Sequence, residues 1–155
     1  MTRSSEPVPS SAAHFVDRVA IDVEAGKIRE FARATHAADP VHIDKQSAAL
    51  AGFDDVLATA THVVVAGHLR NQQEFVASLG LAIERVVVGS VDWEYMRPLV
   101  AGDQLTGTRR VVEDVVRENK RGGRMRLVTL ETDWSEPEGD IAVRQRETLI
   151  EKGPQ

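Results

Sequence analysis

The sequence predicts an α+β fold in which an antiparallel β-sheet is wrapped around a central buried α-helix. Residues 61–79 read as a helix whose first half carries apolar side chains on nearly every side, which is typical of a buried helix. After residue 82 the pattern changes to strands separated by turn residues, and consecutive strands with short turns predict an antiparallel meander. One face of that sheet must be covered, and the helix at 61–79 is the most apolar cover that the chain offers.

The first predicted elements are a strand and a helix. Val16, Val19 and Ile21 favour a short strand over residues 15–21. Asp22 suits a helix N-cap, and Glu24 is well placed in the first helical turn. Apolar or small residues then share one helix face at the expected spacing, at Ile28, Phe31, Ala32 and Thr35.

A loop and a second helix come next. The first helix must end before Pro40, because the residue before a proline is pushed out of the helical region. Asp44 is expected to cap a second short helix that ends at Gly52. The central helix at 61–79 turns polar after Leu69, so its second half should emerge toward solvent.

Four strands are predicted in the second half of the chain, at residues 84–96, 104–116, 124–134 and 141–150. In the first of them Val87, Val91, Trp93 and Tyr95 share one parity, and the two aromatic side chains are expected in the core or at an interface. Turn residues lie between the later strands, at 119–123 and 136–140.

Size and composition indicate one domain of ordinary type. The chain has 155 residues, of which 42% are hydrophobic and 28% charged, with a formal net charge of −5. We expect a disordered tail over residues 1–14, rich in Ser and Pro, and a single domain over 15–152. The absence of cysteine is compatible with a reducing compartment, and no run is apolar enough to span a bilayer, so a cytoplasmic protein is expected.

One local basic stretch stands out in this acidic chain. The negative net charge argues against nucleic acid as the main partner. The stretch is interpreted as a solvated hairpin, or alternatively as a landing site for an acidic carrier protein or a nucleotide phosphate. It comprises Arg109, Arg110, Arg117, Lys120, Arg121, Arg124 and Arg126.

The loop that follows the first helix carries the candidate chemistry. His42 lies two residues after Pro40, an arrangement that can hold an imidazole rigidly. A proton-transfer site at this spacing would be expected to carry a carboxylate five residues earlier, where the chain has Ala37. The alternative is that His42 is a loop histidine that only packs. His36 is expected to be structural, at the end of the first helix.

The order of elements resembles the hot-dog fold of the MaoC-like dehydratases and hydratases, and more closely their FAS1-like type, which includes the substrate-holding subunit of the mycolic-acid-pathway (3R)-hydroxyacyl-carrier dehydratase. The resemblance covers residues 16–150. Three segments carry it, residues 27–34 (KIREFARA), 48–53 (AALAGF) and 97–105 (RPLVAGDQL), and the last is the most specific.

The resemblance implies a dehydratase or hydratase of (R)-3-hydroxyacyl and trans-2-enoyl thioesters. In active members an aspartate and a histidine of this loop move water across the Cα–Cβ bond. Matched residue by residue, that histidine falls on His42 and the proline on Pro40, whereas the asparagine falls on Asp39 and the catalytic aspartate on Ala37. The oxyanion donor is a backbone N–H, which falls near Ala60, Thr61 and His62, where the usual Pro-rich run is replaced.

The predicted catalytic residues are therefore His42, Asp39 and His62, and the predicted substrate-binding residues are Pro40, Ala60, Thr61 and Ala37. Asp39 is alternatively a backbone-holding residue, and His62 a packed one. No cofactor is expected. No metal site is expected either, because the chain lacks cysteine and His62 and His68 are six residues apart.

The missing aspartate leaves three functions open. The first is an active lyase with His42 as acid or base. The second is a non-catalytic acyl-thioester-binding subunit beside a homologous chain that carries the intact Asp/His pair. The third is a hot-dog thioesterase. A thioesterase would need a carboxylate on the buried helix, and only Glu74 is available. The expected partners are an acyl-CoA or acyl-carrier-protein thioester and a second hot-dog chain, identical or homologous, with no nucleic acid or membrane.

Overall fold

The computed structural model describes residues 14–118 and 122–153. In chain order its elements are β1 (His14–Asp22), α1 (Ala25–Ala34), the 3-10 turn η1 (Pro40–His42), α2 (Lys45–Leu50), the 3-10 segment η2 (His62–Leu69), α3 (Gln72–Ser78), η3 (Ile83–Arg85), β2 (Val86–Tyr95), β3 (Gln104–Glu118), β4 (Arg124–Ser135) and β5 (Ile141–Lys152). The expected tail therefore lies outside the described residues except for His14, which begins β1.

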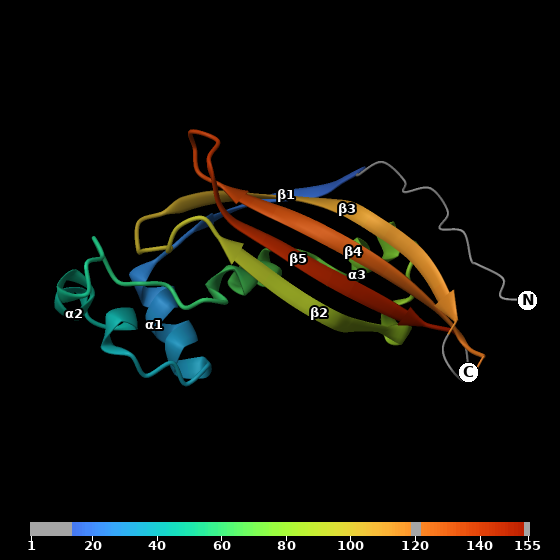
Figure 1. Ribbon diagram of the computed structural model, residues 1–155, viewed down its shortest axis with the longest axis horizontal. Coiled ribbons are helices and arrows are strands. Elements are labelled where there is room, and N and C mark those ends of the chain that lie inside the picture. Colours follow the sequence, from blue (N-terminus) through green and yellow to red (C-terminus); the bar gives the residue numbers. More distant parts are fainter. Residues whose placement is uncertain (1–13, 119–121, 154–155) are drawn as a thin grey trace, which may run out of the picture.

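The described strands form one antiparallel sheet in the order β1-β3-β4-β5-β2 (Figure 1). The long hairpins β3–β4 and β4–β5 confirm the expected meander in the last three strands. The expectation that β2 and β3 are neighbours is wrong, since β2 pairs with β5 and β3 pairs with β1. The connection between β2 and β3 passes across β5 and β4 instead of forming a hairpin.

The central segment is not the continuous helix that the sequence predicts. It consists of the 3-10 segment η2 and the short helix α3, separated at Arg70, which has an extended backbone with φ −116° and ψ 141°. Asn71 restarts the chain as the N-cap of α3, because its side chain accepts a hydrogen bond from the Glu74 N–H. Three consecutive valines at 63–65 disfavour an α-helix, which is consistent with the 3-10 form.

The caps of the other helices differ in how well the sequence predicted them. Asp22 is the last residue of β1, paired with Gln104, so it is not the N-cap of α1. That position belongs to Glu24, whose side chain makes no capping bond. Asp44 caps α2 as expected, because its carboxylate accepts a hydrogen bond from the Ser47 N–H at 2.7 Å.

Two apolar clusters fill the space between the sheet and the helices. The first surrounds Trp134 and includes parts of β1, α1 and η2, and Trp93 and Tyr95 pack against it as expected. The second cluster consists of residues of α3 and of the halves of β3, β4 and β5 that lie farther from Trp134. In β2 a register shift between Val88 and Ser90 breaks the parity, so Val87 is exposed while Val91 is not.

Charged side chains also lie on the side of the sheet that faces α3. Asp17 of β1 accepts hydrogen bonds from both Arg70 and Arg109. The Arg109 guanidinium lies 3.6 Å from the centre of the Phe75 ring. Burial raises the pKa of the nearby Glu147 carboxyl. Buried charges need hydrogen-bonded partners, and Asp17 supplies one for each of the two guanidinium groups, while Arg109 Nε has no partner among the described residues.

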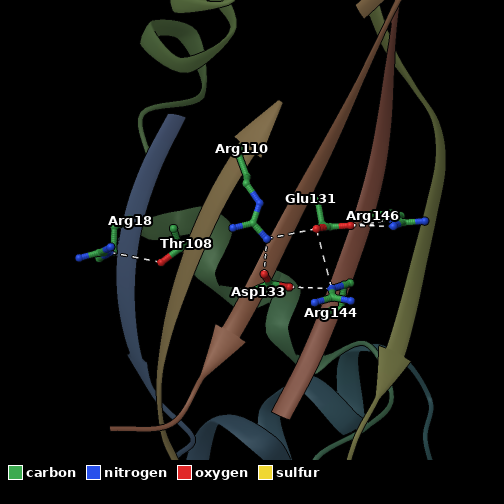
Figure 2. A network of polar contacts seen from close by, with 7 residues as sticks. All are labelled: Arg18, Thr108, Arg110, Glu131, Asp133, Arg144 and Arg146. Atoms are coloured by element: carbon green, nitrogen blue, oxygen red, sulfur yellow. Dashed lines mark hydrogen bonds and ion pairs between the residues drawn. The ribbon is translucent and has the colours of Figure 1, made fainter. Parts of the chain in front are cut away.

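The outer face of the sheet carries a second ionic network, centred on β4 (Figure 2). Arg110 of β3 and Arg144 of β5 both bind Asp133, and Arg146 of β5 donates to Glu131 at 2.8 Å. The basic stretch of the sequence is therefore not one patch, because Arg109 faces inward and Arg110 outward, as alternate strand residues do. Arg126 pairs with Asp114, whereas Lys120 and Arg121 lie outside the described residues.

Candidate functional site

The loop with the candidate residues begins at a well-defined helix end. After the α1 C-cap Thr35, His36 adopts a left-handed backbone with φ 57°. The His36 N–H donates to the Arg33 carbonyl and the Ala37 N–H to the Ala32 carbonyl, the paired bonds of a Schellman motif. Glycine is usual at such a position. His36 is thus structural, as expected, and Ala37 is fixed directly after the helix.

Asp39 holds the turn that presents His42. Its carboxylate accepts a hydrogen bond from the Val41 N–H at 3.1 Å, and Pro40 occupies the first position of η1. Proline suits that position because its fixed φ is already helical and no N–H is lost to the turn. Asp39 therefore makes the backbone-holding contact that was the alternative to a catalytic role.

The imidazole of His42 is oriented by one short hydrogen bond. Its Nδ1 lies 2.7 Å from the Leu57 carbonyl oxygen. A carbonyl oxygen only accepts, so Nδ1 carries the hydrogen and Nε2 of the neutral ring is left with a lone pair. His42 is half-buried. The geometry presents Nε2 as a proton acceptor, which is the state that a general base needs.

Backbone contacts fix both sides of this hydrogen bond. The Leu57 N–H donates to the Val41 carbonyl at 2.9 Å, so the chain around Leu57 is bound twice to the η1 turn. Leu57 also forms a bridge with Val100 in the segment 97–105 that carries the family resemblance. On the other side of the η1 turn, Arg29 of α1 donates a hydrogen bond from Nε to the Ile43 carbonyl. Sequence reasoning missed Leu57 and Arg29, because a backbone acceptor and a distant helix residue leave no local pattern.

The segment after Leu57 holds the remaining predicted residues. Ala60 is exposed, and its carbonyl accepts a hydrogen bond from the Tyr95 hydroxyl of β2. Burial raises the pKa of Tyr95 to about 12, so the phenol stays protonated as this donor. Thr61 is the N-cap of η2 without a capping side-chain bond. Tyr95 thus anchors the expected oxyanion-donor segment to the sheet.

His62 is fully buried, in contrast to the exposed Ala60. Neither ring nitrogen has a hydrogen-bond partner in the part of the chain that the structure describes, and the same holds for Thr59 Oγ1 and Trp93 Nε1. The ring meets Phe31 edge-on at 5.8 Å between centroids. Burial lowers the pKa of His62, and the charge of Lys27 lowers it further, so the imidazole is held neutral.

The site residues thus fall into two groups joined through Leu57. Ala37, Asp39, Pro40 and His42 belong to one compact loop, and residues 58–62 follow Leu57 directly, with Ala60 exposed and His62 fully buried. Two open pockets, of about 550 and 320 Å³, lie elsewhere, beside the start of α1 and beside Arg70. No group of three His, Cys, Asp or Glu side chains within residues 14–118 and 122–153 is placed to bind a metal ion.

Comparison with known proteins identifies the family. Residues 11–145 match the FAS1-like, dehydratase domain region family. A UPF0336 protein of Clavibacter michiganensis subsp. michiganensis is 35% identical over 147 residues, which cover 94% of this chain and 91% of that protein. The chain therefore belongs to the FAS1-like dehydratase-region family.

Solved structures agree on the fold. The C-terminally truncated HadBC (3R-hydroxyacyl-ACP dehydratase) complex from Mycobacterium tuberculosis contains a chain with a TM-score of 0.71 at 20% identity, covering 88% of this chain and 95% of that one. The ChsH1–ChsH2 complex from the same organism gives 0.64 at 17% identity, covering 90% and 96%. The fold is the hot-dog fold, as predicted, and the family supports a hydratase or dehydratase function. No helix among the described residues is long and apolar enough to cross a membrane.

Proposed function

We propose that the chain is one subunit of a lyase that interconverts (R)-3-hydroxyacyl and trans-2-enoyl thioesters, with His42 as its proton-transfer group. The observation that carries the proposal is the hydrogen bond from His42 Nδ1 to the Leu57 carbonyl, which presents Nε2 as the acceptor. In dehydration Nε2 would remove the α-proton, the C–O bond at Cβ would break, and the hydroxyl would leave as water after gaining a proton.

The reaction needs a second group that this loop does not supply. The leaving hydroxyl must be held and protonated, and the methyl side chain of Ala37 can do neither. Asp39 is engaged with the Val41 N–H, and His62 is fully buried. We therefore propose that a carboxylate from a second, homologous chain completes the site.

The thioester carbonyl would be bound by backbone N–H groups near Ala60 and Thr61. Negative charge develops on that oxygen when the α-proton leaves, and fixed N–H donors stabilise it. The exposure of Ala60 and the anchoring of its carbonyl by Tyr95 support this assignment.

A heteromeric assembly is supported by two features. HadBC and ChsH1–ChsH2 are by their names complexes of two different chains. In the described part of this chain β2 pairs only with β5, which leaves its other edge open to a partner strand. The acyl group would be carried by CoA or an acyl carrier protein, and the assembly would work in the cytoplasm.

A purely substrate-binding subunit is the second candidate, and the absence of a carboxylate at Ala37 favours it. The purified chain should be assayed for hydration of crotonyl-CoA and longer enoyl-CoAs, alone and with a homologous chain that carries the Asp-x-Asn-Pro-x-His pattern. Activity of the mixture that falls with His42→Ala supports the proposal. Activity that is indifferent to His42→Ala supports the substrate-binding subunit. Hydrolysis of a saturated acyl-CoA would contradict both and favour a thioesterase.

A further inference from the structure

The free edge of β2 exposes apolar side chains. It displays Val87 and Val88, the latter 57% exposed, in a strand of high β-propensity. The opposite edge strand β1 exposes Phe15 but also carries the exposed charges of Arg18 and Asp22, which are of the kind that discourages strand pairing. An unpaired apolar edge attracts another strand. The edge of β2 is therefore available to pair with a strand of a partner chain.

The outer face of β2 bears two exposed carboxylates, each opposite an arginine that makes its ion pairs with β4. Asp92 lies opposite Arg146 in the sheet register, and Glu94 opposite Arg144. Both arginines nevertheless direct their hydrogen bonds to β4, to Glu131 and Asp133 (Figure 2).

In the described residues neither Asp92 nor Glu94 has an ion pair within 4.0 Å or a hydrogen bond from its side chain, and both are exposed. The exposed end of the edge is thus negatively charged.

A second copy of the chain cannot neutralise these carboxylates by strand pairing. No Lys or Arg occurs from Val86 to Tyr95, so no register of β2 against β2 places a cation opposite Asp92 or Glu94. The flanking Arg85 and Arg97 are held by carboxylates elsewhere, at Glu151 and at Asp103 with Glu136. Cross-strand pairs of opposite charge stabilise a sheet, and like charges oppose it.

We propose that the β2 edge selects a homologous chain whose own edge strand carries Lys or Arg opposite Asp92 and Glu94, in preference to a second copy of this chain. Val87 and Val88 supply adhesion, and the two carboxylates supply the choice of partner. This selection rests on the two-chain assembly of the proposed function and determines which chain can join that assembly.

Two variants of the chain itself serve as probes. The basic-edge variant carries Val87→Lys, Ser90→Lys, Asp92→Lys and Glu94→Lys, which places cations along the outer face of the strand in any central register. The neutral-edge variant carries glutamine at the same four positions. All four side chains are exposed, so the neutral-edge variant is expected to fold with little change in stability. The basic-edge variant places ammonium groups opposite Arg144 and Arg146 and is expected to fold with some loss of stability, and thermal unfolding checks both.

Sedimentation velocity then measures binding of the tagged wild-type chain to each variant. We expect the basic-edge variant to bind at least about tenfold more tightly than the neutral-edge variant, with the preference weakened in high salt. Asp92→Asn with Glu94→Gln in the wild-type chain should remove the preference, whereas Glu113→Gln with Glu118→Gln on β3 should keep it. Equal binding of both variants, or no association of either, overturns the proposal. The measurement follows association alone, so its outcome is independent of the hydration assay.

Discussion

Replacing His62 by leucine should stabilise the protein, although the change removes a polar group from beside the candidate site. Two ring nitrogens without partners in the described structure leave one donor and one acceptor unsatisfied, and each such group costs roughly 1–3 kcal/mol. The edge-on contact with Phe31, worth about 0.5–1.5 kcal/mol, is lost. The net expectation is a gain of roughly 0.5–5 kcal/mol in the free energy of unfolding at neutral pH.

The gain should grow as the solution becomes acidic. Burial lowers the pKa of His62 below its ordinary value of 6.5, so the unfolded chain binds a proton first as the pH falls through 6.5. The wild-type protein then loses stability below that pH, by at most about 1.4 kcal/mol per pH unit for one proton, and is free of this loss above it. The leucine variant lacks this dependence.

Urea unfolding followed by tryptophan fluorescence, at neutral pH and about one and two units below it, measures both effects. The matched control is His68→Leu, which changes an exposed histidine of the same segment and should alter stability by less than about 0.5 kcal/mol. A His62→Leu variant that is less stable than wild type, with a gap that does not change with pH, would refute the assignment of an unpaired, neutral imidazole.

Two further predictions concern the backbone, each measured by the same urea unfolding. Gly107→Ala should destabilise by roughly 1–3 kcal/mol, because its Cβ would lie 2.6 Å from the Trp134 ring, whereas Gly26→Ala in open space on α1 should stabilise by about 0.5–1 kcal/mol. The opposite order would contradict the packing of Trp134. His36→Gly should stabilise by roughly 0.5–1 kcal/mol by relieving the left-handed backbone, and a loss of stability would contradict the Schellman end of α1.

The sequence predicted the sheet well, because its strands alternate and are bounded by clear turns. It did not predict which strands pair, since the β1–β3 and β2–β5 pairings depend on contacts far apart in the chain. The break in the central helix was missed although its signals were present. Three adjacent valines and the capping residue Asn71 are visible in the sequence, but the pinning of Arg70 by Asp17 is not.

The candidate site was predicted in part. The positions of Asp39, Pro40 and His42 in one turn follow from local rules, since an Asx cap and a proline define the turn. The orientation of the imidazole did not follow, because its acceptor is a backbone carbonyl fifteen residues away. The burial of His62 also lay beyond the sequence, since apolar residues on nearly every side left its direction open.

We assign His42 to an acid–base site that lacks only the carboxylate at position 37, and the proposed function depends on this claim. The most direct test is the rate of crotonyl-CoA hydration by purified Ala37→Asp, beside wild type and Ala37→Asp with His42→Ala. Ala37 is only partly buried, so the side chain has room to project from the end of α1. A gain of about 10²–10⁴-fold over the wild-type chain that His42→Ala abolishes is the predicted result. No gain in a folded Ala37→Asp variant, or a gain that survives His42→Ala, would contradict the claim.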